Sequence, residues 1–210
     1  INAVYFKGNW TERFDPALTR DATFLAPDGV RLPVKMMSRS GSMRYHQDAL
    51  AEIADLPYGW DRYAMAVLLP RPGVSLGELR EALQPTQWAS WLEALQETSM
   101  DLQLPRFTLS YETRLVDVLT QLGMGIAFDP NQADFTGINA AGDLHISDVR
   151  HKTFVKVDEE GTEAAAVTSV EMGTTSMPPV MRVDRPFVFV IHERHTGAIL
   201  FIGQVTRPED

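Results

Sequence analysis

Apolar and polar residues alternate along several short stretches of the chain, and this spacing is typical of strands with one buried face. The alternation is weak in the first of these stretches. The stretches predicted as strands on this pattern are residues 2–6, 32–37, 41–46, 102–110 and 145–157.

Unbroken apolar runs predict strands that are buried on both faces. Residues 63–69 form such a run, which ends at Pro70 and is the expected central strand. Near the end of the chain, 187–192 and 199–205 flank the turn residues 196–197. These two runs predict a terminal pair of antiparallel strands.

Helical spacing of apolar residues occurs in the middle of the chain. It predicts helices over 75–83 and 85–97, where tryptophan and leucine recur on one face above an acidic one. A third helix is predicted over 112–122, because Gly123 is a natural stop. Strands with a few helices give a mixed α+β class.

Length, composition and charge limit the number of domains and the classes of partner that are expected. The chain has 210 residues, 44% of them hydrophobic, with no low-complexity linker, so one domain or part of one is expected. A net charge of −9 disfavours nucleic acid and anionic membranes as partners. No apolar run is long enough to span a bilayer, and cysteine is absent, which excludes thiol chemistry and disulfides.

Residues 159–170, EEGTEAAAVTSV, are compatible with two structures. In a strand, small residues such as Thr162 and Ala164 lie on one face and Glu163 lies on the other. The alanines also favour a helix. A segment with two acceptable conformations is a candidate for a conformational switch.

Motifs of common enzymes are missing: the sequence contains no HExxH, GxxxxGK[ST], GxGxxG or GxSxG. His192 and His195 fall on opposite faces of a predicted strand, which disfavours a metal site. The acidic run 158–160 has nothing to position it for acid–base catalysis, so a solvated charge run is expected. The sequence therefore predicts neither an enzyme nor a cofactor or metal site.

Three blocks in order, together with the C-terminal MRVDRPFVFVI at 181–191, carry a family resemblance. They are NAVYFKGNW at 2–10, LQLPRF at 102–107 and VRHKTFVKVDEEGTEAA at 149–165. The chain resembles a serpin, a serine protease inhibitor.

The resemblance implies the serpin fold, of which residues 1–210 form the C-terminal part of a single domain. The reactive loop is then expected at about 159–180 and the C-terminal strands at 181–206. Full serpins are nearly twice as long as this chain. An incomplete sheet leaves strand edges and apolar surface uncovered, so the chain alone is expected to aggregate or fold poorly.

Inhibition by a suicide-substrate mechanism is the function that the resemblance implies. A target serine protease cleaves the exposed loop, becomes acylated, and is trapped when the first half of the loop inserts into the main sheet. Insertion requires small residues in the loop hinge, and none of the residues on the inserting face is a proline, charged or aromatic. The hinge residues are Glu159, Glu160, Gly161, Thr162, Glu163, Ala164, Ala165, Ala166, Val167 and Thr168.

Pro186 of the PF motif lies 25 residues after Gly161, which is the spacing in serpin loops of the common length. The resemblance therefore implies a scissile bond between Thr175 and Ser176. Threonine at this position disfavours trypsin-like proteases and suits elastase-like or subtilisin-like ones. A different loop register would instead present Met172 or Met177. The alternative is that these are ordinary loop residues.

Four residues outside the loop match positions that control insertion in serpins. Asn2 and His151 match a hydrogen-bonded pair where the strands part, although they are equally explained as satisfied core polar groups. Trp10 matches the tryptophan at the point of first insertion. Arg106 resembles the partner of Glu159 in an ion pair at the base of the loop, and an exposed pair of this kind contributes only ~0–1 kcal/mol.

Two other functions stay open from the sequence. A non-inhibitory serpin with a chaperone, carrier or storage role shares most of these blocks, and a partner-binding module could use the loop as a recognition peptide. The family resemblance favours an extracellular protein. It also favours a monomer when complete, with a risk of polymers formed by insertion of one molecule's loop into another's sheet.

Overall fold

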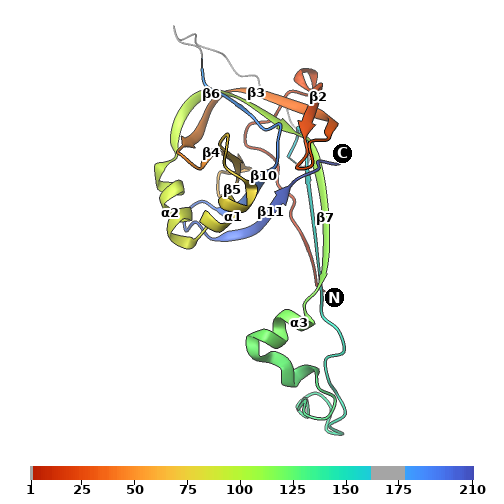
Figure 1. Ribbon diagram of the computed structural model, residues 1–210. Coiled ribbons are helices and arrows are strands. Elements are labelled where there is room, and N and C mark those ends of the chain that lie inside the picture. Colours follow the sequence, from red (N-terminus) through yellow and green to blue (C-terminus); the bar gives the residue numbers. More distant parts are fainter. Residues whose placement is uncertain (1, 162–177) are drawn as a thin grey trace. The chain divides into compact units, whose positions relative to one another are not determined.

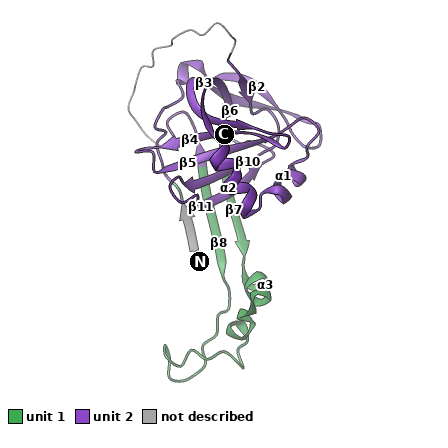
Figure 2. Cartoon of the chain, turned by 90° about the vertical axis from the view of Figure 1, so that its left-hand side faces the viewer, with its two compact units in different colours: residues 1–6, 109–155 green, residues 7–108, 156–210 purple. Residues whose placement is uncertain are grey.

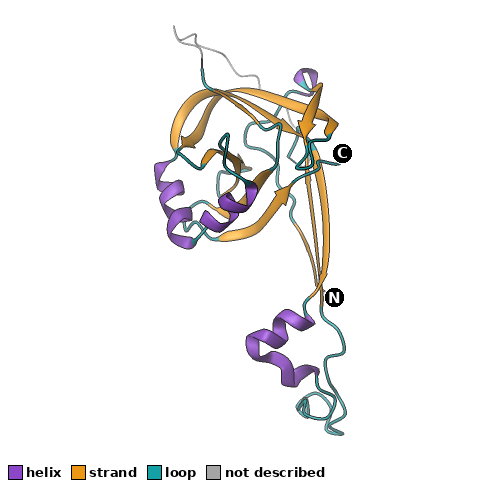
Figure 3. Cartoon of the chain, in the orientation of Figure 1, coloured by secondary structure: helices purple, strands orange, loops and turns teal. Residues whose placement is uncertain are grey.

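The computed structural model describes residues 2–161 and 178–210 (Figure 1). It divides into two compact units (Figure 2). Unit 1 contains residues 1–6 and 109–155, and unit 2 contains residues 7–108 and 156–210. Each unit is built around its own sheet, and the mixture of strands and few helices agrees with the predicted α+β class (Figure 3).

An eight-stranded sheet forms unit 2. Its neighbouring strands are antiparallel except for β6 and β9, which are parallel. In spatial order the strands are β11 (Ile199–Val205), β10 (Phe187–Glu193), β5 (Tyr63–Pro70), β4 (Ala51–Tyr58), β3 (Arg31–Gln47), β6 (Gln96–Pro105) and β9 (Val180–Arg182), with β2 (Arg20–Leu25) paired to β3.

The predicted apolar strands are confirmed. β5 lies inside the sheet and is buried from its second residue to its last. β10 and β11 form an antiparallel pair in which Phe187 is opposite Val205. Gly203 is needed in this pair, because a Cβ there would lie 2.6 Å from the ring of Phe189.

Two helices cover one face of this sheet. α1 (Leu76–Ala82) begins at a capping box in which Ser75 and Glu78 bond to each other's backbone N–H. α2 (Pro85–Ala94) follows and ends three residues before the predicted end, where β6 begins. The buried side chains that join helices and sheet are Leu79, Trp88, Trp91, Ile53, Leu68, Val188 and Val190.

The strand predictions in unit 2 are incomplete. The stretches 32–37 and 41–46 are one strand, β3, which continues through Gly41 at φ +136°. β2 and β4 were not predicted. β4 lacks alternation because it is buried on both faces and still contains Asp55, whose carboxylate bonds to His192 inside the sheet.

The stretch 102–110 also differs from its prediction as one strand. β6 ends at Pro105 and β7 (Phe107–Arg114) begins two residues later in a different sheet. Arg106 lies between them, and its backbone N–H donates to the carbonyl of Lys35 at 2.9 Å. Proline before Arg106 favours such a break, because it removes a ladder donor.

A three-stranded sheet forms unit 1, in the order β1 (Asn2–Tyr5), β8 (Arg150–Val157), β7. β8 begins five residues later than predicted. The last two residues of β8 and the first two of β7 belong to unit 2.

The predicted helix over 112–122 is wrong in its first three residues, because β7 extends to Arg114. The helical part consists of α3 (Val116–Leu119) and two irregular turns, Thr120–Met124 and Gly125–Phe128. Gly123 has φ +96° and interrupts them. Another short turn, Pro16–Leu18, precedes β2. In the described ranges, no helix has the length and apolar character required to cross a bilayer.

Candidate functional site: the base of the predicted loop

A tight turn ends β8 and forms the base of the predicted loop. The backbone N–H of Gly161 donates to the carbonyl of Asp158 at 3.3 Å, and the N–H of Glu160 donates to the Asp158 carboxylate at 3.1 Å. The acidic run is therefore organised by its own backbone rather than simply solvated.

Trp10 packs against this turn and donates hydrogen bonds to it. Its ring is 3% exposed and stacks on Tyr58 with centroids 4.3 Å apart. The indole Nε1 donates to the carbonyl of Asp158 at 2.9 Å, and the backbone N–H of Trp10 donates to the carbonyl of Glu160 at 3.2 Å. Trp10 thus donates hydrogen bonds to two backbone carbonyls of the loop base, those of Asp158 and Glu160.

Gly161 allows this close approach. It has φ +79°, and an added Cβ would lie 2.3 Å from the backbone nitrogen of Trp10 and 2.6 Å from the carbonyl of Gly8. Real Cβ atoms are never this close to backbone, so the residue has to be glycine for the turn to rest against Trp10.

Glu159 is the buried centre of the cluster, with 4% of its surface exposed. Its Oε1 accepts hydrogen bonds from Arg106 Nε at 2.9 Å, from Arg106 Nη2 at 2.6 Å and from the hydroxyl of Thr19. The backbone carbonyl of Glu159 accepts from the N–H of Phe14 at 3.1 Å. The expected ion pair is present, and the prediction of a solvated acidic run is wrong for Glu159, which is buried.

The hydrogen bonds decide the charge state of the pair. Burial alone would raise the pKa of Glu159, yet the bonds from Arg106 and Thr19 outweigh it and leave this pKa below its usual value. The bond to Glu159 raises the pKa of Arg106. The two side chains are therefore held in their charged forms.

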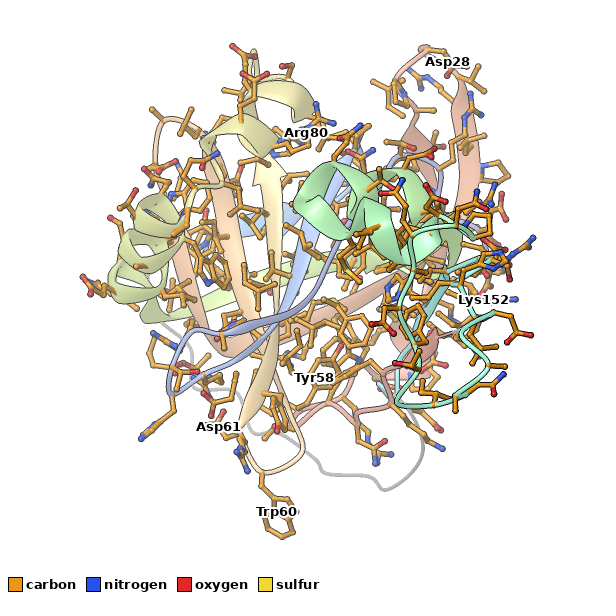
Figure 4. The ribbon with its side chains drawn as sticks, turned by 90° about the horizontal axis from the view of Figure 1, so that it is seen from below. Asp28, Tyr58, Trp60, Asp61, Arg80 and Lys152 are labelled. Carbon is orange, nitrogen blue, oxygen red and sulfur yellow. The ribbon has the colours of Figure 1, made fainter. Side chains whose placement is uncertain are left out.

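A hairpin between β4 and β5 supports Trp10. Thr11 N–H donates to the carbonyl of Pro57 at 2.9 Å, Gly59 N–H donates to the carbonyl of Asn9 at 2.7 Å, and Tyr58 lies under the Trp10 ring. Burial raises the pKa of the Tyr58 phenol well above its ordinary value. At the tip, Trp60 is fully exposed and points away from the hairpin (Figure 4).

The roles of Tyr58 and Thr19 were not predicted from the sequence. Both lie far along the chain from Glu159 and carry no motif of their own. A local signal beside Tyr58 is Gly59, because glycine is a common turn residue.

In unit 1, Asn2 lies directly opposite His151 in the parallel pairing of β1 with β8. The register continues to Tyr5 opposite Phe154. His151 is half-buried, and the side chain of Asn2 is outside the description. The two residues are brought together as backbone neighbours, and their role as a gate stays a prediction.

The predicted scissile residues Thr175 and Ser176 lie outside the described residues, and so do the hinge positions from Thr162 to Thr168.

The two histidines that were weighed as a metal pair are separated by their surroundings. His192 is buried in β10 and its Nε2 lies 2.8 Å from Asp55. His195 follows in a turn that lines an open cavity of about 530 Å³ with charged residues. Among residues 2–161 and 178–210, no group of three or more acidic or histidine side chains is arranged to hold a metal ion.

Curated relatives match nearly the whole chain. A serine protease inhibitor from Cyanea capillata is 36% identical over 213 residues, which cover 99% of this chain and 56% of the relative. Mouse antithrombin-III is 36% identical over 214 residues, covering 99% of this chain and 46% of the relative. Mouse glia-derived nexin is 38% identical, covering 99% and 54%. The chain thus spans about half the length of these relatives.

Solved structures match the fold. Native protease nexin-1 with heparin has a TM-score of 0.84 at 32% identity, covering 98% of this chain and 55% of that one. The thermophilic serpin tengpin in its native state has a TM-score of 0.82 at 31% identity, covering 98% and 54%. The family model for serpins (serine protease inhibitors) matches residues 1–208. The chain therefore belongs to the serpin family.

Proposed function

We propose that these residues are the C-terminal part of a single serpin domain and that the complete domain inhibits serine-type endopeptidases by conformational trapping. The relatives named as a serine protease inhibitor, an antithrombin and a nexin support inhibition as the general activity. Their length, about twice that of the matched region, supports a longer domain.

The observation that carries the proposal is the buried anchor at Glu159 directly after β8. In unit 1, β8 is paired with β1, and the predicted loop follows β8 in the chain. Insertion of the loop beside β8 would replace the β1–β8 ladder by two new ladders, so the inserted state gains backbone hydrogen bonds and apolar burial. Breaking the Arg106–Glu159 contact is then the first cost of insertion.

In the proposed mechanism, the serine of the protease attacks the carbonyl carbon of Thr175. The amide bond to Ser176 breaks, the new amine leaves, and an ester joins Thr175 to the protease. The hinge residues Thr162 to Thr168 then enter the sheet and move the ester away from the protease's oxyanion hole. Threonine at this position favours an elastase-like or subtilisin-like target.

The test is denaturing gel electrophoresis of the complete serpin mixed with an elastase-like and a subtilisin-like protease, with mass spectrometry of the released peptide. The expected result is a band that survives denaturation at the summed mass and a peptide that begins at Ser176. Loop cleavage without this band would contradict inhibition and favour a non-inhibitory serpin. Binding without cleavage would favour a partner-binding module.

Replacing Thr175 by arginine tests the assigned bond. Because trypsin-like proteases bind arginine through a carboxylate in their primary pocket, T175R is expected to raise the rate of trypsin inhibition by about 100-fold or more and to lower elastase inhibition. A different loop register would present Met172 instead, so Met172→Arg is the matched control. If M172R shifts the preference and T175R does not, the assigned bond is wrong.

A further inference from the structure

The last residues of the chain, 206–210, form a C-terminal strap that is tied to unit 2 at several points. Arg207 pairs with Asp28 at the turn between β2 and β3. The backbone carbonyl of Glu209 accepts a hydrogen bond from the N–H of Thr108 at 2.6 Å. The strap is therefore held beside the corner where β6 passes into β7.

At this corner the strap meets the anchor of the loop base. The carboxylate of Asp210 lies 3.7 Å from Nη1 of Arg106. Arg106 uses its other two nitrogens, Nε and Nη2, for Glu159. One guanidinium thus has a carboxylate on each of two different edges.

This geometry fixes the orientation of Arg106. A guanidinium is planar, so two carboxylates on different edges restrict its rotation more than one does. The two acids do not compete for the same N–H, because Glu159 takes Nε and Nη2 while Asp210 faces Nη1. Asp210 therefore supports the bond to Glu159 instead of weakening it.

We propose that Asp210 is a positioning residue that acts through Arg106, and that the C-terminal strap thereby restrains the base of the reactive loop. The inference rests on the proposed function, in which release of Glu159 precedes loop insertion. Under this proposal, the C-terminal strap contributes one of the contacts that delay loop insertion.

The expected effect is modest. The side chains of Arg106 and Asp210 are 30% and 52% exposed, so water and salt screen their attraction. Losing an exposed pair of this kind changes an equilibrium or a rate by about two- to five-fold. The effect should be greatest at low ionic strength.

The experiment compares Asp210→Asn, Asp210→Glu and Glu209→Gln in the complete serpin. Glu209 is the matched control, because its contact with Thr108 is made by the backbone. The measurement is the rate of spontaneous conversion to the loop-inserted form at raised temperature and two salt concentrations, followed by native gel and by loss of elastase inhibition. We expect D210N to convert about two- to five-fold faster at low salt and to approach the wild type at high salt, with D210E and E209Q close to the wild type.

Glu159→Lys is the reference variant that distinguishes a failure of the role of Asp210 from a failure of the proposed function. If E159K accelerates conversion while D210N matches E209Q or converts more slowly than the wild type, the role of Asp210 is wrong and the proposed function stands. If D210N accelerates conversion equally at both salt concentrations, or if D210E fails to restore the wild-type rate, the electrostatic positioning is wrong. If neither the wild type nor E159K forms a loop-inserted species or a covalent complex, the proposed function fails and this inference fails with it.

Discussion

The two sheets of this serpin chain differ in how they are held together. In the eight-stranded sheet of unit 2, β5 and β10 are buried along nearly their whole length. In the three-stranded sheet of unit 1, β7 is mostly half-buried or exposed after its first residue, and β8 has only Val155 and Val157 buried. Within this chain, which spans about half the length of its relatives, apolar burial contributes more to the first sheet than to the second.

The loop base belongs to the strongly buried unit. Trp10, Arg106 and Glu159 all lie in unit 2, while the β1–β8 pair that the loop is proposed to enter lies in unit 1. In the proposed mechanism, the anchor of the loop therefore lies in the more buried unit, and the strand pair that would exchange its partner lies in the less buried one.

The largest expected effect comes from a cavity in the rigid sheet. Leu68 in β5 is 0% exposed, so Leu68→Ala should lower the free energy of unfolding by about 2–5 kcal/mol. Tyr111 in β7 is 60% exposed, and Tyr111→Ala should cost less than about 1 kcal/mol. Urea unfolding of both variants of the complete serpin measures the contrast, and equal losses would contradict the difference between the two sheets.

A smaller effect is expected at Gly161, where strain and contact act together. Gly161→Ala should lower stability by about 1–3 kcal/mol and expose the backbone amide of Trp10 to hydrogen exchange. Gly29 is the matched control, because it has φ +80° with nothing within 4 Å of an added Cβ. Gly29→Ala should show the strain alone and leave Trp10 protected. Loss of protection in both variants would mean that the contact at Gly161 is unimportant.

Acid should loosen the loop base by a smaller amount. The pKa of Glu159 is lowered in the folded protein, so its contribution is fully present above the ordinary value of 4.5 and is lost as the pH falls through the lowered pKa. Protection of the Trp10 amide should therefore decrease below pH 4.5 in the wild type.

Glu159→Gln is the control for this pH dependence. Glutamine does not titrate, so the variant should show weaker protection of Trp10 with no further step in that acid range. A step of the same size in E159Q would assign the acid effect to another group.

Local patterns predicted the parts of the fold whose burial is uniform. The apolar run of β5, the pair β10–β11 and both helices against the sheet follow from periodicity and turn residues. β4 escaped prediction because Asp55 and Pro57 interrupt an otherwise buried strand. His192, which bonds to Oδ1 of Asp55, is distant in sequence, so no local window contains the information.

The candidate site shows the same limit. Family resemblance pointed to Trp10, Arg106 and Glu159, and the structure places them in one cluster. The burial of Glu159 and the stacking of Tyr58 on Trp10 depend on tertiary contacts that composition does not reveal. A prediction from charge alone gave a solvated acidic run, because charge does not show which carboxylate contacts a partner.

The parallel pairing of β1 with β8 has a consequence for the order of folding. β2, β3, β4 and β5 are consecutive antiparallel strands, so their contacts close short loops. Asn2 and His151 are separated by most of the chain, and closing so long a loop is slow. The β2–β5 meander is therefore expected to form first and the β1–β8 pair late, which leaves the edge of β8 open to other chains until β1 pairs with it.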